Sequence, residues 1–173
     1  IIFIAAFYCI AAIFNLYIPN TGVSHRILNK NPIFLIHEFR HCFNLLWTDK
    51  LGQISLAVTT LFWGAGATLQ FIVLKWAEMA LDYPLNKAAQ LQGIVAIGIA
   101  VGAVMAARFV SLRQSVKVIP LGIAMGVVVM AMTIAYKLWI AVILLMLIGG
   151  LAGFFVVPMN ALLQHRGHIL MGA

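Results

Sequence analysis

Five long apolar runs are separated by shorter polar segments along this chain, over residues 1–18, 54–74, 91–110, 118–136 and 138–163. Each run is close to the roughly 20 residues that an α-helix needs to cross about 30 Å of hydrocarbon. The runs are too long and too continuous for strands, and transmembrane β-strands would alternate apolar and polar positions instead. The pattern therefore predicts an all-α integral membrane protein with about five transmembrane helices.

Composition excludes a water-soluble globular domain. Of the 173 residues, 64% are hydrophobic and 9% are charged, and the mean hydropathy is +1.08. Such a chain cannot cover its surface with polar groups, so it needs lipid around it. The first run lacks the basic start and the cleavage site of a secretory signal. It begins at Ile1 rather than Met, so we expect the chain to enter partway along a helix.

Basic residues gather in alternate loops, which predicts the orientation of the chain. Lysine and arginine are retained on the cytoplasmic side when loops are short. Eight of the 11 basic residues fall on one predicted side and three on the other. We therefore expect the chain to start outside and end inside, and this bias explains the net charge of +7 without nucleic-acid binding. The predicted inside residues are Arg26, Lys30, Arg40, Lys50, Arg108, Arg113, Lys117 and Arg166, and the outside ones are Lys75, Lys87 and Lys137.

The predicted cytoplasmic loop over residues 19–53 contains an amphipathic helix. Asn31 can cap its start, and Pro32 suits its first turn. We expect this helix to lie in the headgroup layer of the membrane, with its apolar side toward the lipid. The apolar positions are Ile36, Phe39, Phe43, Leu46 and Trp47, and the polar ones are His37, Arg40, His41, Asn44 and Thr48.

The same segment contains His37, Glu38 and His41 in the H-E-x-x-H pattern of zinc metalloproteases. Two histidines one turn apart can bind zinc while the glutamate activates water. A third ligand is required, and only His165 or His168 shares the predicted side of the membrane. We interpret the pattern as the solvated face of the helix and predict no enzyme, no metal and no cofactor. A membrane zinc metalloprotease is the alternative.

Three pairs of glycines are spaced as G-x-x-x-G inside the apolar runs. Helices in lipid approach closely where no side chain separates their backbones, so we predict helix packing at these positions. Pro158 and Asn160 are further packing or gating candidates, because the proline breaks one helical hydrogen bond and the asparagine can satisfy the freed groups. The three pairs are Gly98 and Gly102, Gly122 and Gly126, and Gly149 and Gly153.

The second run has one face of small and polar residues that ends in charge. Charges near membrane depth favour a water-filled cavity or a partner. Lys75 is the strongest ligand candidate on this face, although it can instead pair with Glu78 one turn later. The members of the face are Thr60, Gly64, Thr68, Phe71 and Lys75, and the same helix also carries Trp63 and Gln70.

Four stretches of the sequence carry a resemblance to a known family: TLFWGAGATL at residues 60–69, VAIGIAVG at 95–102, LMLIG at 145–149 and GFFVVPMNALLQ at 153–164. They resemble bacterial lysophospholipid transporters of the major facilitator superfamily, closely from about residue 55 to residue 167 and more loosely before that. The resemblance implies that the five runs correspond to the sixth to tenth of twelve helices. The fold would then be a partial major-facilitator-type bundle, with residues 54–173 forming most of the C-terminal half.

The resemblance also implies a function. It implies import of lysophospholipid, chiefly lysophosphatidylethanolamine, to the cytoplasmic leaflet of the bacterial inner membrane, where an acyltransferase restores the second chain. The helix over residues 54–74 would line the central cavity. The substrate-path candidates are Thr60, Trp63, Gly64, Thr68, Gln70, Phe71 and Lys75.

Several features depart from the family pattern. Gln70 stands where we expect a basic residue in some relatives, and residues 106–113 keep only the basic residues of the superfamily's gating motif. Five helices before Ile1 and two after Ala173 would be needed to complete the fold. Because substrate sites of such transporters form between two halves, we expect a fragment that needs the missing half to transport. A non-transporting membrane scaffold is the other alternative.

Overall fold

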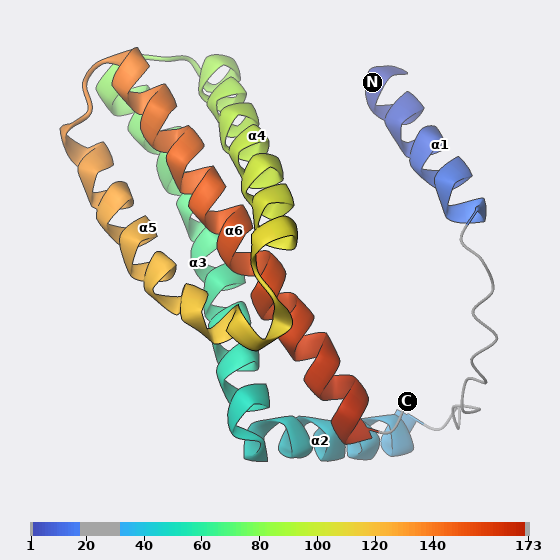
Figure 1. Ribbon diagram of the computed structural model, residues 1–173. Helices are drawn as coiled ribbons and strands as arrows, with labels where there is room; N and C mark the ends of the chain where they lie inside the picture. Colours follow the sequence, from blue (N-terminus) through green and yellow to red (C-terminus); the bar gives the residue numbers. More distant parts are fainter. Residues whose placement is uncertain (1, 18–31, 172–173) are drawn as a thin grey trace. The chain divides into compact units, whose positions relative to one another are not determined.

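The computed structural model describes residues 2–17 and 32–171, and the regular structure in this part of the chain is helical. The chain divides into two compact units, Ile1–Glu38 and Phe39–Ala173, with the boundary inside α2. The predicted all-α class is confirmed. In chain order the elements are α1 (Ile2–Leu16), α2 (Pro32–Thr48), α3 (Lys50–Leu81), α4 (Leu85–Phe109), the 3-10 helix η1 (Leu112–Val118), α5 (Ile119–Ala131), the 3-10 turn η2 (Met132–Ile134) and α6 (Leu138–Met171) (Figure 1).

Four helical segments of the described chain are long and apolar enough to cross a membrane. They are Lys50–Leu81, Leu85–Phe109, Leu112–Ile134 and Leu138–Leu170, and they contain most of the second to fifth predicted runs. In the first unit, α1 is an uncharged helix of 15 residues, about 22 Å long at 1.5 Å per residue. Its assignment as a fifth span stays a prediction. The predicted cap at Asn31 lies outside the described residues.

The helix α3 is longer than its apolar run, because both of its ends are capped. The Asp49 carboxylate accepts a hydrogen bond from the backbone N–H of Gly52 at 2.7 Å, which satisfies one free donor of the first turn. At the other end, Asp82 takes the left-handed conformation, with φ at 53°, that commonly ends helices. The apolar run over residues 54–74 ends just before Lys75, but the helical backbone continues to Leu81, before the cap at Asp82.

The helices of the second unit, from α3 to α6, run alternately up and down the bundle (Figure 1). The start of α3 and the C-terminal part of α6 share one end, where Nε of Arg166 lies 3.6 Å from the Asp49 carboxylate. The 3-10 helix η1, which carries Arg113 and Lys117, lies toward the same end. Basic residues predicted to lie inside therefore gather at one end of this unit. Which side of a membrane that end faces stays a prediction.

The helices α4 and α6 pack backbone to backbone along the predicted glycines. A Cβ added to Gly98 would lie 2.5 Å from the carbonyl oxygen of Met146, and one added to Gly102 would overlap the carbonyl of Gly150. On the facing helix α6, a Cβ added to Gly149 or to Gly153 would likewise overlap a backbone carbonyl oxygen of α4. These four glycines therefore lie where the backbones of α4 and α6 come into contact, and we call them the glycine seam.

The third glycine pair does not behave in this way. A Cβ added to Gly126 would have no atom within 4 Å, apart from its own helix, and one added to Gly122 would meet only the ring of Phe155, at 3.6 Å. The prediction of close helix packing at this pair is wrong for the described part of the chain. Its spacing is the same as in the seam, but no helix lies opposite.

Two apolar clusters stabilise the second unit, one near each end of α3. The first consists of Ala77, Ala88, Leu91, Met132, Leu145 and Ile148. The second consists of Val118, Phe155 and Met159. Many other large apolar side chains point outward, among them Ile123 and Trp139 at 73% and 79% exposure. An exposed apolar surface of this kind suits a lipid environment.

Candidate functional site

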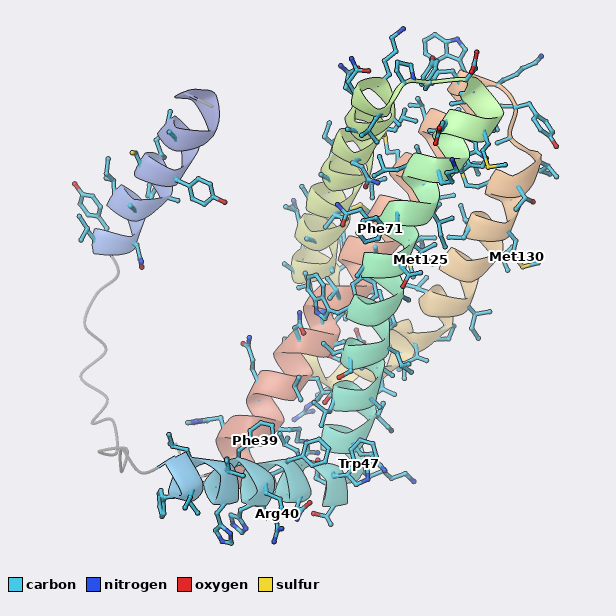
Figure 2. The ribbon with its side chains drawn as sticks, turned by 180° about the vertical axis from the view of Figure 1, so that it is seen from behind. Phe39, Arg40, Trp47, Phe71, Met125 and Met130 are labelled. Atoms are coloured by element: carbon cyan, nitrogen blue, oxygen red, sulfur yellow. The ribbon has the colours of Figure 1, made fainter. Side chains whose placement is uncertain are left out.

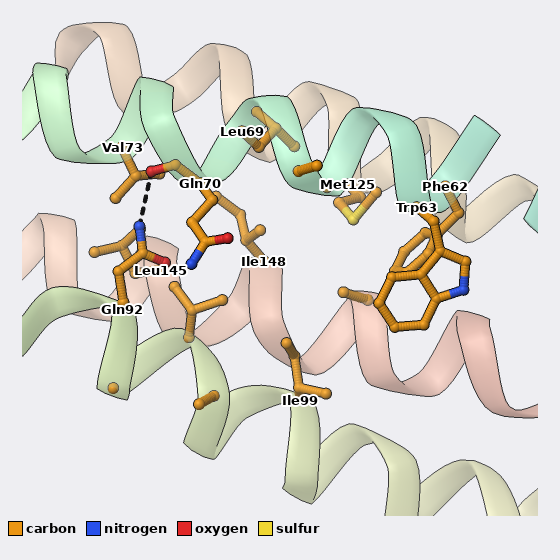
Figure 3. A pocket seen from close by; sticks show the side chains of 16 residues that line it. Phe62, Trp63, Leu69, Gln70, Val73, Gln92, Ile99, Met125, Leu145 and Ile148 are labelled. Carbon is orange, nitrogen blue, oxygen red and sulfur yellow. Dashed lines mark hydrogen bonds between the residues drawn. The ribbon is translucent and has the colours of Figure 1, made fainter. Parts of the chain in front are cut away.

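A pocket of about 630 Å³ lies between α3, α4 and α6 (Figure 3). Its walls are mostly apolar, as is typical of sites for small ligands. From α3 it is lined by Phe62, Trp63, Gly66, Ala67, Leu69, Gln70 and Val73, from α4 by Gln92, Gly93, Val95, Ala96 and Ile99, from α5 by Met125, and from α6 by Leu145, Ile148 and Ala152.

The pocket is hollow because small residues line its sides. A Cβ added to Gly66 of α3 or to Gly93 of α4 would have no atom within 4 Å, apart from its own helix. Ala67 and Ala96 also line it and add only a methyl group each. The α6 side of the pocket is well packed. Its residue Leu145 is fully buried and belongs both to the pocket lining and to the first apolar cluster.

One end of the pocket is aromatic. The ring of Phe62 lies 5.6 Å from that of Phe155 and meets the indole of Trp63 edge-on at 5.8 Å, both measured between centroids. Contacts of this kind hold aromatic side chains in defined positions. Phe62 thus joins this end of the pocket to the second apolar cluster.

The opposite end carries two amides. Nε2 of Gln92 donates a hydrogen bond of 2.8 Å to the backbone carbonyl of Gln70, and this bond joins α4 to α3 (Figure 3). The carboxamide of Gln70 also points into the gap between the two helices (Figure 3). Within the described residues, the Gln70 side chain makes no hydrogen bond. The pocket is therefore an apolar slot with neutral hydrogen-bonding groups at one end.

The structure divides the predicted substrate-path residues into two groups. Trp63 and Gln70 line the pocket. The others lie exposed elsewhere on α3 and do not line it, namely Thr60, Gly64, Thr68, Phe71 and Lys75. Their role as a cavity wall stays a prediction.

Local bonds account for two polar groups on that exposed face. The hydroxyl of Thr68 donates to the carbonyl of Gly64 at 3.1 Å, within the same helix. Nζ of Lys75 lies 2.8 Å from the carboxylate of Glu78, which is the predicted pairing. Because both charged side chains are well exposed, the ion pair contributes little to stability and leaves Lys75 accessible to a ligand.

The proline and asparagine of α6 lie away from the pocket. Pro158 is buried within the unbroken helix, and Asn160 is half-buried two residues later. Neither lines the pocket. A gating role for these residues stays a prediction.

The H-E-x-x-H segment lies on α2, at the boundary between the two units of the chain. His37 and His41 are both exposed on this helix. Within the described residues, no group of three or more His, Cys, Asp or Glu side chains could hold a metal ion. A zinc-protease interpretation therefore lacks a third ligand there.

The predicted amphipathic helix itself is present as α2. Phe43 stacks on Trp47 with 5.7 Å between ring centroids and lies 6.4 Å from Phe39. Phe39 and Arg40 point to different sides of the helix (Figure 2). Its position in a headgroup layer stays a prediction.

Sequence reasoning missed Gln92, Gly66 and Gly93. Gln92 could have been found, because a glutamine next to the apolar positions of a membrane helix signals a polar contact or a ligand. The two glycines gave no such signal, since an isolated glycine looks the same whether it faces a helix or a space. Only the arrangement of α3 against α4 distinguishes these cases.

The fold and the pocket define a helical membrane protein that can hold an apolar ligand with a neutral polar end. Comparison with known proteins gives a more specific result. The chain is similar to proteins named lysophospholipid transporter LplT from Yersinia pestis (strain Pestoides F) and Yersinia pseudotuberculosis (serotype O:3, strain YPIII), each 43% identical over 170 residues. The predicted resemblance to lysophospholipid transporters is thereby confirmed over 98% of the chain.

The matched region is only part of each relative. The chain spans 42% of the length of the curated relatives that it matches. No protein-family model matches the chain, and no solved structure matches it significantly.

Proposed function

We propose that this chain forms part of a lysophospholipid transporter and that the pocket between α3, α4 and α6 holds the acyl chain of the lipid. The observation that carries the proposal is the 43% identity to proteins named as lysophospholipid transporters, which extends over 98% of the chain. The pocket supports it, because its long apolar walls and amide end match the two chemical parts of a single-chain lipid.

The pocket is large enough to take an acyl chain. Its volume of about 630 Å³ and its mostly apolar walls suit a long, flexible hydrocarbon. We propose that one acyl chain occupies it.

The exposed face with Thr60, Gly64, Thr68, Phe71 and Lys75 has a separate role in this proposal. A surface of small and polar residues is unsuited to lipid and suited to a water-filled path. We place it against the part of a longer transporter that lies outside this chain, where it contacts the headgroup. Transport would then require both the present helices and that complementary part.

We further propose transport of lysophosphatidylethanolamine to the cytoplasmic leaflet of a bacterial inner membrane, for use by an acyltransferase. The basic end of the second unit supports cytoplasmic placement of η1. Single cysteines at the exposed residues Ser111 and Asn86 test this, in a background without Cys9 and Cys42. In spheroplasts, an impermeant maleimide should label the cysteine at Asn86 only. Labelling at Ser111 instead would contradict the orientation.

The function is tested in a chimaera in which this chain replaces the matching segment of the Yersinia pestis relative. Spheroplasts that contain it should take up labelled lysophosphatidylethanolamine but not labelled phosphatidylethanolamine. The unaltered relative and an empty vector are the controls, at matched membrane levels. Because a chimaera can assemble poorly, binding of the same lipids to the present chain in nanodiscs is measured in parallel. Neither uptake nor binding of lysolipid would refute the proposal.

The zinc-protease alternative is not supported. Its motif has no third ligand in the described part of the chain, and the relatives are named as transporters. We therefore propose a transporter rather than an enzyme.

A further inference from the structure

We infer that the side chains of Gln92 and Gln70 recognise the free glycerol hydroxyl of a single-chain phospholipid. This inference rests on the proposed function, since it assigns one contact within the same pocket. It explains why two neutral amides occupy the end of an otherwise apolar slot. Unpaired polar groups are costly at membrane depth, so their presence there calls for a partner.

The hydrogen bond between the two helices fixes which atoms of Gln92 are free. A backbone carbonyl can only accept, so the group that faces Gln70 must be the NH₂ of Gln92. This leaves one Nε2 hydrogen and the acceptor Oε1 of Gln92 without a partner in the described part of the chain. The amide of Gln70 adds two further donors and one acceptor.

The two amides together suit a ligand group that both donates and accepts. A phosphate can accept from the free N–H groups but offers no hydrogen to either Oε1, and an ammonium can donate to the Oε1 atoms but accepts from no N–H group. A hydroxyl does both, because it can donate to Oε1 of Gln92 and accept from Nε2 of Gln70. In a lysophospholipid, this hydroxyl stands next to the carbon that carries the single ester-linked chain.

The same contact discriminates against phospholipids with two chains. An ester in place of the hydroxyl has no hydrogen to donate, so Oε1 of Gln92 stays unpaired when such a lipid occupies the pocket. Sites built to bind a hydroxyl reject ligands that lack it for this reason. Hydrogen bonding at the amide end therefore favours the single-chain lipid.

The test compares lysophosphatidylethanolamine with its 2-deoxy analogue, which has the same chain and headgroup but a hydrogen in place of the hydroxyl. Dissociation constants are measured for the present chain in nanodiscs. The unaltered chain should prefer the hydroxyl lipid by about fivefold to thirtyfold, the contribution of one to two net hydrogen bonds of about 1 kcal/mol each. Gln92→Leu should abolish the preference.

A purely structural role of Gln92 gives a different result, because loss of the bond to α3 would weaken both lipids alike and leave their ratio unchanged. Gln90→Leu is the matched control, since Gln90 is an exposed glutamine of the same helix that does not line the pocket. If Gln92→Leu fails to fold, Gln70→Leu replaces it. The Gln70 side chain makes no hydrogen bond in the described structure, and this variant should also reduce the preference.

The outcomes separate this inference from the proposed function. Equal affinity of the unaltered chain for the two lipids would overturn the hydroxyl contact alone, as would a preference that survives in both glutamine variants. If lysophosphatidylethanolamine neither binds the chain nor enters through the chimaera, the proposed function is refuted, and the hydroxyl contact with it.

Discussion

Glycines on the two sides of α4 have opposite structural effects, close helix contact on one side and open space on the other. On the side that faces α6, Gly98 and Gly102 bring the helices into backbone contact. On the side that faces α3, Gly93 and the opposing Gly66 border an open pocket. The difference lies in what surrounds them. In the seam, small residues occur on both helices at matching heights, which is how helices associate in lipid. At the pocket, Gly66 and Gly93 meet no facing backbone, and α3 and α4 pack together in the first apolar cluster, at one end of the bundle.

The largest effect is expected where the seam is broken. A Cβ at Gly102 overlaps the carbonyl of Gly150, and backbone atoms of a packed helix cannot move aside as a flexible side chain can. Gly102→Ala should therefore destabilise the bundle by about 1–3 kcal/mol, and Gly102→Leu should prevent folding. Unfolding in mixed detergent micelles, followed by circular dichroism, measures this. Gly93→Ala on the same helix is the control and should be at least as stable as the unaltered chain, because the added methyl group meets no atom and alanine favours the helix.

A smaller and purely functional effect is expected where the pocket is filled. Gly66 and Gly64 lie two residues apart on α3, and neither has an atom within 4 Å of an added Cβ outside its own helix. Only Gly66 lines the pocket. Gly66→Leu should weaken lysophosphatidylethanolamine binding to the present chain by about tenfold or more, because the added side chain occupies the space of the acyl chain. Gly64→Leu should leave binding to this chain unchanged.

The same two variants, placed in the chimaera, test the exposed face of α3. Loss of uptake by Gly64→Leu with normal binding to the isolated chain would assign that face to the transport path. If Gly64→Leu instead abolishes binding while Gly66→Leu does not, the lipid lies on the exposed face and the pocket is not its site. The comparison of the two glycines thus separates the two candidate surfaces.

The sequence predicted the helices and the seam better than it predicted the pocket. Apolar runs of membrane length and paired G-x-x-x-G spacings are local features, and each has a direct structural consequence. The pocket depends on how α3 lies against α4, and this arrangement is tertiary rather than local. Trp63 and Gln70 were found because they are polar within an apolar run. The small residues opposite them carried no comparable signal.

The ends of the helices were also harder to predict from the sequence than the helices themselves. Hydropathy located α3 but placed its end at the first charge, whereas the caps Asp49 and Asp82 determine where the helical hydrogen bonds stop. Spacing alone also failed at Gly122 and Gly126, where the motif is present without a facing helix. The G-x-x-x-G spacing describes the surface of one helix only, whereas close packing also requires a second helix opposite it.

The smallest effect is expected at Gly126, which has the spacing of the seam but no neighbour. The side chains around it on α5 face outward, as shown by Ile123 and Met130 at 73% exposure each. Gly126→Leu adds an apolar side chain to this surface and removes a residue with poor helix propensity, so stability should stay the same or rise by up to about 0.8 kcal/mol. The micelle unfolding experiment measures this beside Gly102→Leu. A destabilisation by Gly126→Leu as large as that at Gly102 would show that α5 packs tightly through this glycine, and the contrast between seam and open glycine would then fail.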